Sequence, residues 1–266
     1  MPKLKFACHL YTWQSLTDMH LAPVFRQAAE AGYDGVEGLG FQSAEDFVEA
    51  TACARSWNLD MVNARGRTPS QCIRYNAVLG NRFAEVWEGM PDDFGPEGTT
   101  HEEHFPMAAK YFEPIMAEAE QYGIQLGHHI HMGQLLVTND DLDLMHQYIP
   151  KLGILFDTGH LAAAGGDNLR VIREYPEKIT HVHLKDFHRA EGWDPEKPDW
   201  TTSHFERIGY GNVGLDFKAI LGGLEQIGYE GWVSIELDPQ KPLMDKGIRI
   251  VDMMRQSREF LASIGY

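Results

Sequence analysis

The sequence predicts a single closed (β/α)8 barrel over residues 1–266. Short apolar runs alternate with longer amphipathic segments along the chain, and no linker or low-complexity segment interrupts the resulting eight strand–helix units. Such alternation is typical of a parallel sheet covered by helices, and barrels of this kind reach this length as one domain. The alternative is a doubly wound open sheet. It usually carries a Gly-rich phosphate turn after its first strand, which "ACHLYTWQS" lacks.

The predicted strands are the short apolar runs, each bounded by turn residues or by the next amphipathic segment. In chain order they are 5–10, 35–39, 59–64, 83–88, 124–131, 153–157, 180–185 and 232–237.

The segments between the strands have the apolar spacing of helices. Several of them end at a glycine directly before the next strand, as in "AEAGYDGVEG" and "LEQIGYEGWVSIE", and glycine is a favoured helix C-cap. In chain order the predicted helices are 21–32, 45–58, 102–122, 140–149, 168–176, 216–228 and 244–264.

The composition limits the class of protein. A net charge of −16 argues against nucleic-acid phosphate or an anionic membrane as the partner. The cysteines Cys8, Cys53 and Cys72 form no CxxC pair, which fits a reduced interior better than a disulfide framework. Without a signal-peptide pattern or an apolar stretch as long as a membrane span, we expect a cytoplasmic protein. Its oligomeric state stays open, with a homo-oligomer as one option.

Histidines concentrate in three short segments, "GHHIHMGQ", "FDTGH" and "HVHLKDFH". Enzymes with this barrel fold build their sites at the carboxyl ends of the strands, where these segments are expected to lie. Alternate side chains of a strand share a face. His129 and His131 therefore point one way from the fifth strand, and His128 points the other way.

The same alternation groups polar residues on the later strands. His183 and Lys185 share one face of the seventh strand, and Glu236 and Asp238 share one face at the end of the eighth. Asp157 closes the sixth strand. Four consecutive strands, the fifth to the eighth, thus end in His, Asp, His and Glu.

Each of these residues could have an ordinary structural role. A histidine at a strand end is often hydrogen-bonded in a core, and Asp157 before Thr-Gly could cap the next helix. Crowded at one barrel mouth, however, uncompensated charged groups would repel one another and suffer from desolvation. A divalent cation relieves both problems and favours such ligands, so the sequence predicts a site for Mn²⁺, Co²⁺, Mg²⁺ or Zn²⁺.

The stretches "AEAGYDGVEG", "FDTGH", "HVHLKD" and "GNVGLDFKAILGGLEQIGYEGWVSIELD" resemble the xylose-isomerase-like sugar isomerase/epimerase superfamily of TIM barrels. The strand "HHIHMG" followed by "ILFDTGH" looks most like its inosose dehydratase branch, whose members dehydrate a keto-inositol. The resemblance covers nearly the whole chain, and the segment 65–105 is the least typical.

Matched residue by residue, the resemblance implies that the metal is held by His129, Asp157, His183 and Glu236. Many superfamily members have a glutamate at the fifth-strand position. In the epimerases it is also one of two carboxylates that move a proton between the two faces of the substrate. Its replacement by His129 puts two-base epimerisation in doubt, although imidazole is a competent ligand. The change also raises the net charge of the site by one, which favours carbonyl polarisation.

The resemblance also implies substrate contacts. His160, three residues after the Asp, and Arg189, six residues after the His, match the superfamily's substrate-contacting His and Arg. A bidentate Arg suits oxygen-rich ligands. His9 and Glu37, at two other predicted strand ends, are further candidates for substrate contact, and Glu37 could equally belong to a charged layer inside the barrel.

Acid–base chemistry needs groups besides the ligands. A nearby cation could lower the pKa of Lys185, or this lysine could pair with a carboxylate such as Glu37 or Asp186. His131 is a second candidate, since imidazole changes charge near neutral pH. Glu236 counts both as a ligand and as a catalytic residue.

Other side chains near predicted strand ends are weaker candidates. Glu88 and His160 could also move protons, and three aromatic residues could stack on a sugar ring or simply pack. These aromatic residues are Tyr11, Trp13 and Trp87.

The leading hypothesis is a metal-dependent lyase of the inosose dehydratase kind, which dehydrates a cyclic keto-polyol through an enediolate. Its partner would be a small sugar or cyclitol. The alternative is a ketose or keto-sugar isomerase or epimerase, which uses the same enediolate. The missing fifth-strand glutamate favours the lyase. The superfamily's endonuclease branch would need a basic groove, which the acidic composition disfavours. A non-enzymatic sugar-binding or scaffold barrel is the remaining interpretation.

Overall fold

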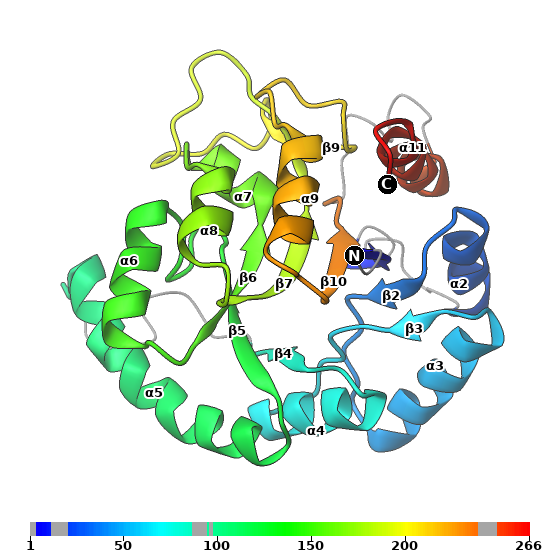
Figure 1. Cartoon of the computed structure of the whole chain (residues 1–266), viewed down its shortest axis with the longest axis horizontal. Helices are drawn as coiled ribbons and strands as arrows, with labels where there is room; N and C mark the ends of the chain where they lie inside the picture. The colour runs from blue at the N-terminus through cyan, green and yellow to red at the C-terminus, as the bar shows by residue number, and fades with distance from the viewer. Residues whose placement is uncertain (1–3, 12–20, 87–94, 96–97, 239–248) are drawn as a thin grey trace.

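The computed structural model describes residues 4–11, 21–86, 95, 98–238 and 249–266. Eight parallel strands curl into a barrel, and helices form a layer around it (Figure 1), so the predicted fold class is confirmed. The barrel strands are β1 (Lys5–His9), β2 (Gly35–Glu37), β3 (Asp60–Met61), β4 (Phe83–Glu85), β5 (Gln125–His129), β6 (Gly153–Asp157), β7 (Ile179–Leu184) and β10 (Trp232–Ile235).

The strands follow one another around the barrel in the order β3-β2-β1-β10-β7-β6-β5-β4. Because all of them are parallel, their carboxyl ends meet at one mouth, and the register sets Asp157 level with His183. Among the described residues no backbone ladder joins β3 to β4. There the side chain of Asn63 accepts a hydrogen bond from the backbone N–H of Glu85 at 3.1 Å.

The helices connect the strands and bury one face each. Two of them, α4 and α7, were not predicted. For α4 the sequence contains signals at both ends, because Thr68 caps its start and Gly80 ends it with a φ of +78°. The helices are α2 (Leu21–Glu30), α3 (Ala44–Ser56), α4 (Pro69–Leu79), α5 (His101–Gln121), α6 (Asn139–Tyr148), α7 (Thr158–Ala163), α8 (Asn168–Glu174), α9 (Phe217–Gln226) and α11 (Ile250–Ser263).

A two-stranded antiparallel element was also not predicted. β8 (Asp186–His188) pairs with β9 (His204–Glu206), and the segment from 186 to 206, which we call the arm, projects from the barrel mouth after β7. The carboxylate of Asp186 accepts hydrogen bonds from the backbone N–H groups of Gly209 and Gly211 at 2.9 Å, which fixes the base of the arm.

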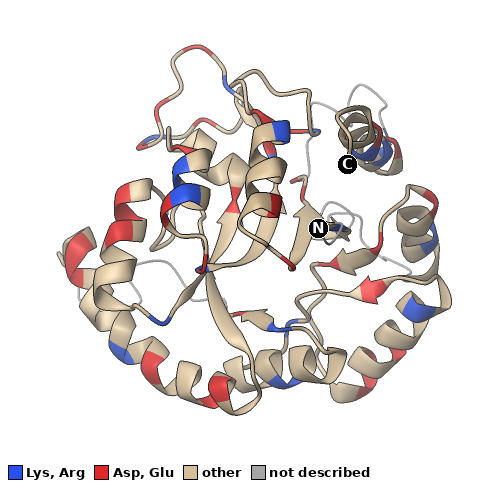
Figure 2. Ribbon diagram, viewed as in Figure 1, with Lys and Arg blue, Asp and Glu red and all other residues tan. Residues whose placement is uncertain are grey.

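The apolar core lies between the strands and the surrounding helices as one large cluster of buried side chains. Charged residues are spread over the outer helices and the connecting loops (Figure 2), as expected of a solvated surface. Within the described ranges, no helix combines the length and apolar character needed to cross a membrane. Cys8, Cys53 and Cys72 are all free thiols.

Candidate metal centre and active site

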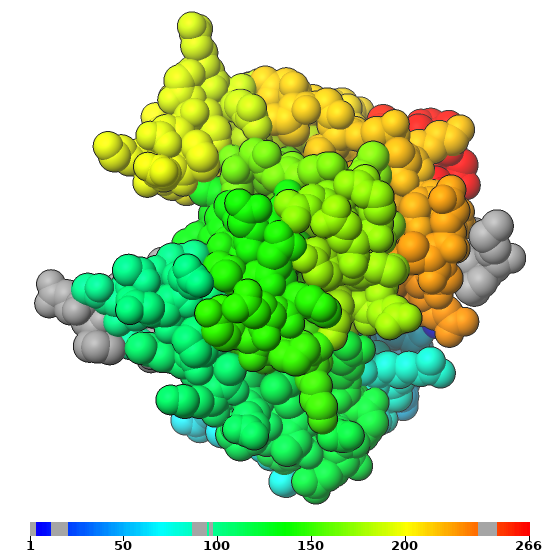
Figure 3. All heavy atoms as spheres, turned by 60° about the vertical axis from the view of Figure 1, so that its left-hand side comes forward, coloured from blue at the N-terminus to red at the C-terminus, as the bar shows by residue number. Residues whose placement is uncertain are grey.

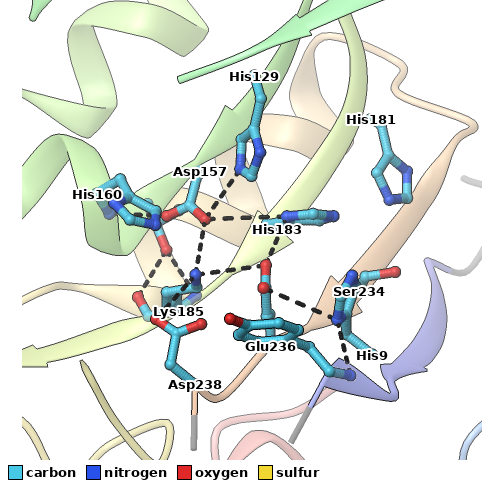
Figure 4. Close-up of polar contacts among 12 residues, drawn as sticks. His9, His129, Asp157, His160, His181, His183, Lys185, Ser234, Glu236 and Asp238 are labelled. Atoms are coloured by element: carbon cyan, nitrogen blue, oxygen red, sulfur yellow. Dashed lines mark hydrogen bonds and ion pairs between the residues drawn. The ribbon is translucent and has the colours of Figure 1, made fainter. Parts of the chain in front are cut away.

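Four polar side chains converge at the carboxyl ends of neighbouring strands. His129 ends β5, Asp157 ends β6, His183 lies on β7 and Glu236 directly follows β10. Each offers one ligand atom, these atoms lie within 4.8 Å of one another, and all four residues are buried. Figure 4 shows them around a common point. The structure therefore brings together the four residues that the resemblance implies as metal ligands.

The separations between these atoms suit one divalent cation. Asp157 Oδ2 lies 3.3 Å from His129 Nε2 and 3.9 Å from His183 Nδ1, which in turn lies 2.7 Å from Glu236 Oε2. Ligands of a tetrahedral cation with bonds near 2.1 Å stand roughly 3.4 Å apart. His183 Nδ1 and Glu236 Oε2 are buried and close to each other, but they do not have hydrogen-bond geometry, so neither atom has a hydrogen-bond partner, which is rare for buried polar atoms. The donor set therefore fits a metal ion.

Lys185 lies beside this cluster (Figure 4). Its Nζ is 3.4 Å from the carboxylates of Asp157 and Glu236, and 3.5 Å from that of Asp238. Burial works against the charged ammonium, but the three carboxylates outweigh it, so the pKa of Lys185 lies above its ordinary value. Of the two expectations for this lysine, the structure shows carboxylate pairing.

Glu37 lies one layer deeper in the barrel. Its Oε1 accepts a hydrogen bond from His183 Nε2 at 3.1 Å, and its Oε2 accepts from His181 Nε2 at 2.7 Å and from the Ser234 hydroxyl. Burial opposes its charge, but the two histidines outweigh it and hold the pKa of Glu37 well below its usual range. Glu37 does not line the cavity described below, nor does it pair with Lys185 as the sequence suggested.

The sequence analysis also suggested Asp186 as a partner of Lys185, and this prediction is wrong. Asp186 begins the arm, and its carboxylate is taken up by backbone N–H groups of Phe187, Gly209 and Gly211. The physical reason is the period of the strand, because successive side chains point to opposite faces. Lys185 therefore contacts the side chains that point to the barrel mouth, whereas the side chain of Asp186 points away from them.

A second buried carboxylate stands behind His129. Glu85, the last residue of β4, places Oε1 3.3 Å from His129 Nδ1, and its Oε2 accepts hydrogen bonds from Asn63 and Arg65. Although burial opposes its charge, Arg65 and His129 hold the pKa of Glu85 far below its usual range. The sequence analysis missed Glu85 and the two residues that donate hydrogen bonds to it. The available signal was a charged residue inside an apolar strand, two positions after the inward-facing Phe83.

His9 ends β1 and lines the cavity together with Tyr11, as expected of a substrate contact. Its Nδ1 lies 3.8 Å from Glu236 Oε1, and burial lowers the pKa of His9 to about 4. His9, Glu37 and His183 also bring ligand atoms within 4.8 Å of one another. Both oxygens of Glu37 already accept hydrogen bonds, however, so the four-residue set is the better metal site.

His131 and His160 both line the cavity, and their ring centroids lie 3.8 Å apart. Burial lowers the pKa of His131 to about 4 and holds that of His160 well below its usual range. His160 lies in the first turn of α7. Asp157 caps this helix, because its Oδ1 accepts a hydrogen bond from His160 N at 2.7 Å, and its Oδ2 faces His129.

Arg189 is not brought together with the other predicted site residues. Its side chain is exposed, and Nη2 donates a hydrogen bond to the carbonyl of Ala162 at 3.1 Å, near the end of α7. It is absent from the lining of the cavity. The backbone of the arm carries it away from the mouth, because the chain leaves the barrel at β8.

A cavity of about 1090 Å³ opens above the candidate ligands. The histidines line its polar side, and the arm supplies an apolar side with Pro195, Pro198, Trp200 and Phe205. Figure 3 shows the arm, in yellow, above a recess in the surface. An apolar cavity with a few convergent polar groups is typical of a small-molecule site. Three residues named as candidates from the sequence lie outside the described residues: Trp13, Trp87 and Glu88.

Comparison with known proteins gives a consistent family. The sequence profile described as xylose isomerase-like TIM barrel matches residues 25–262. Inosose dehydratase from Lacticaseibacillus casei is 33% identical over 137 residues, which cover 48% of this chain and 46% of that protein. The chain thus spans about half the length of the curated relatives it matches.

Solved structures share the fold along nearly the whole chain. D-psicose 3-epimerase from Clostridium cellulolyticum H10 superposes with a TM-score of 0.74 at 14% identity, covering 98% of this chain and 99% of that chain. The IOLI protein, solved with a zinc atom, superposes with a TM-score of 0.68 at 16% identity, covering 98% of each chain. At these identities the likeness concerns the fold alone.

Proposed function

The chain belongs to the xylose isomerase-like TIM-barrel family, and we propose that within it the protein is a metal-dependent dehydratase of a cyclic keto-polyol. The observation that carries the proposal is the convergence of His129, Asp157, His183 and Glu236 below a large cavity. These residues would hold the ion. A divalent ion there supplies a Lewis acid that polarises a carbonyl and acidifies the neighbouring C–H group. The similarity to inosose dehydratase supports the choice of a ring substrate.

His131 and His160 are suited to move the two protons that dehydration requires. His131 Nδ1 lies 2.8 Å from the carbonyl of Met132, so Nδ1 carries the proton and Nε2 can act as a base. His160 Nδ1 accepts from Met132 N at 3.3 Å, so its Nε2 carries the proton and can act as an acid. One ring would take the proton next to the carbonyl, and the other would protonate the departing hydroxyl.

The remaining groups are suited to orienting a polyol. Lys185, with a raised pKa, stays charged and can donate hydrogen bonds to substrate oxygens or stabilise developing negative charge. Glu236 and His9 lie on the same side of the cavity. Trp200 and Phe205 also line the cavity and offer flat apolar surfaces, which suit the C–H face of a ring and exclude water.

The test is to incubate metal-loaded protein with a keto-inositol and with a panel of ketoses, and to follow enone absorbance. We expect an enone from the keto-inositol, and none from Asp157→Asn or Glu236→Gln. Asp140→Asn, at a side chain that is 92% exposed, serves as the control. A new ketose without an enone would make the protein an isomerase or epimerase. Parent-like dehydration by both ligand variants would refute the metal site.

A further inference from the structure

Asn63 lies at the centre of the layer beneath the candidate ligands. It follows β3, is fully buried, and has a φ of +47°, which few residues other than glycine and asparagine adopt. Its Nδ2 donates to Glu37 Oε1 at 2.7 Å and to Glu85 Oε2 at 3.1 Å, and its Oδ1 accepts from Glu85 N at 3.1 Å. Turning the amide over would set its oxygen against two carboxylates, so the partners fix its orientation.

Each carboxylate that Asn63 holds stands behind one imidazole. Glu37 Oε1 accepts a hydrogen bond from His183 Nε2 at 3.1 Å, and Glu85 Oε1 lies 3.3 Å from His129 Nδ1, within ion-pair distance although the two atoms do not have hydrogen-bond geometry. A carboxylate behind an imidazole takes the ring N–H and leaves the other nitrogen bare for a metal. The bare atoms are then His183 Nδ1 and His129 Nε2, and these are the two nitrogens that face the other candidate ligands.

We propose that Asn63 is a positioning residue, whose single amide holds both carboxylates and thereby orients two imidazole ligands toward one divalent cation. The inference rests on the proposed metal site. Two buried carboxylates converge on one Nδ2 here, and without it they would lose a donor that they share, which leaves Glu85 to Arg65 and Glu37 to His181, His183 and Ser234. A left-handed backbone at a fully buried residue is also the kind of local strain that gathers at functional sites.

Asn63→Asp tests this role with almost no change in volume. Aspartate tolerates the same backbone, and it can keep the acceptor for Glu85 N that links β3 to β4. It loses both donated hydrogen bonds and sets a third carboxylate against the other two. We expect its affinity for Co²⁺, measured by competition with a chromogenic chelator, to fall about 10–100-fold. The visible absorption of the Co²⁺ form should change as well.

Asn58→Asp is the matched control. Asn58 also has a positive φ of +56°, but it is exposed just after α3. This variant should bind Co²⁺ like the parent. Asn63→Gly is the second test variant, because glycine keeps the backbone without strain while the amide is lost. It should show the same fall in affinity.

The outcomes separate this inference from the proposed function. A folded variant at position 63 with parent-like Co²⁺ affinity and spectrum would overturn the inference, and so would failure of both variants to fold, since the role would then be structural. If the parent binds no Co²⁺, the proposed function fails. Long-range ¹H–¹⁵N spectra of the metal-free protein then decide the inference. We expect protected ring N–H signals from His183 and His129 that Asn63→Asp loses, and unchanged signals would refute it.

Discussion

His129 and His131 leave β5 on the same side but have different surroundings. His129 is buried between carboxylates, with Nε2 3.3 Å from Asp157 and Nδ1 3.3 Å from Glu85. The ring of His131 is less buried and lies 3.8 Å from the ring of His160, and both His129 and His131 line the cavity. Two residues of one strand thus present one ring suited to an ion and one suited to a substrate.

We therefore expect His129→Ala to lose its metal, and His131→Ala to keep its metal while turnover falls roughly a hundredfold or more, the usual scale for a general acid or base. Elemental analysis and turnover of a keto-inositol measure the two effects. His146→Ala, at an exposed position on α6, should match the parent in both. Parent-like metal content and turnover in both test variants would remove the assigned roles.

The charge at the site depends on residues that the ligand pattern does not contain. His129 in place of a carboxylate should raise the net charge by one, but Glu85 returns a negative charge directly behind the ring. The expected gain in carbonyl polarisation is therefore smaller than the ligands alone imply. The four candidate ligands were implied by the family resemblance, and strand alternation gave only the face on which such side chains would lie. The contacts of Glu85 and Asn63 could not be predicted, since they arise only when the residues that follow β3 meet β4 around the barrel.

At the level of elements, α7 holds His160 at the cavity by packing closely on β7. Gly159, in its first turn, leaves the necessary space. A Cβ there would lie 2.7 Å from Lys185 Cβ and 2.8 Å from Lys185 Cγ, closer than such atoms normally approach. The glycine therefore sets the distance between two elements of the site.

Gly159→Ala should destabilise the fold by about 1–3 kcal/mol, the usual cost of overpacking, and should lower turnover because Lys185 and His160 shift. Urea unfolding and turnover of a keto-inositol measure these effects. Gly40→Ala is the control, because a Cβ at that position meets no atom within 4 Å. Equal stability and equal turnover of the two variants would show that the packing tolerates the methyl group.

A polar contact joins α5 to α6 and makes part of the stability depend on pH. His101 Nε2 lies 2.8 Å from Asp141 Oδ1, and this hydrogen bond raises the pKa of His101 above its ordinary value of 6.5. A raised pKa in the folded state gives stability that is fully present below the unfolded pKa and is lost as the pH rises through the folded pKa. Since the ring is 45% exposed, screening keeps the effect near ~0.5 kcal/mol.

His101→Ala should accordingly cost more stability at pH 5.5 than at pH 9. The measurement is urea unfolding of the parent and the variant at both values, at low ionic strength, because salt screens such pairs. His146→Ala should show no comparable difference between the two conditions. A loss in His101→Ala that is equal at both pH values would mean that packing, and not the ion pair, is responsible.

Most of the elements that the sequence did not reveal are short, and the exception is α4 with 11 residues. α7 has six residues and starts directly at the end of β6, with Asp157 as its cap. β8 and β9 have three residues each and pair outside the barrel. The apolar periodicity of a helix or strand can be recognised in a sequence only when it extends beyond one or two helical turns or two strand alternations. The site residues carried by these elements, including Phe205, could therefore be placed only by the three-dimensional structure.

Over the whole molecule, the barrel strands were predictable because apolar runs and amphipathic segments alternate in register with the fold. The predicted and observed bounds agree for 153–157, whereas the run 59–64 shortens to β3 (Asp60–Met61). The shortening has a physical cause. Within the described ranges β3 has a ladder with β2 only, and the chain beyond it makes side-chain contacts through Asn63. Strand ends depend on the neighbouring strand, which a single sequence does not specify.

The barrel also connects metal binding with global stability. The candidate ligands come from β5, β6, β7 and the end of β10, so an ion bound by them joins consecutive strands that unfolding must separate. A ligand that binds only the folded state at a hundred times its Kd adds about 2.7 kcal/mol to the free energy of unfolding. For a chain of this size that corresponds to a rise in Tm of roughly 5–10 °C.

Calorimetry of the parent with EDTA and with added Co²⁺ measures the shift. Asp157→Asn should show no shift, and Asp140→Asn should show the full one. A Tm of the parent that does not respond to any of the four candidate cations would contradict a metal site made of these strands.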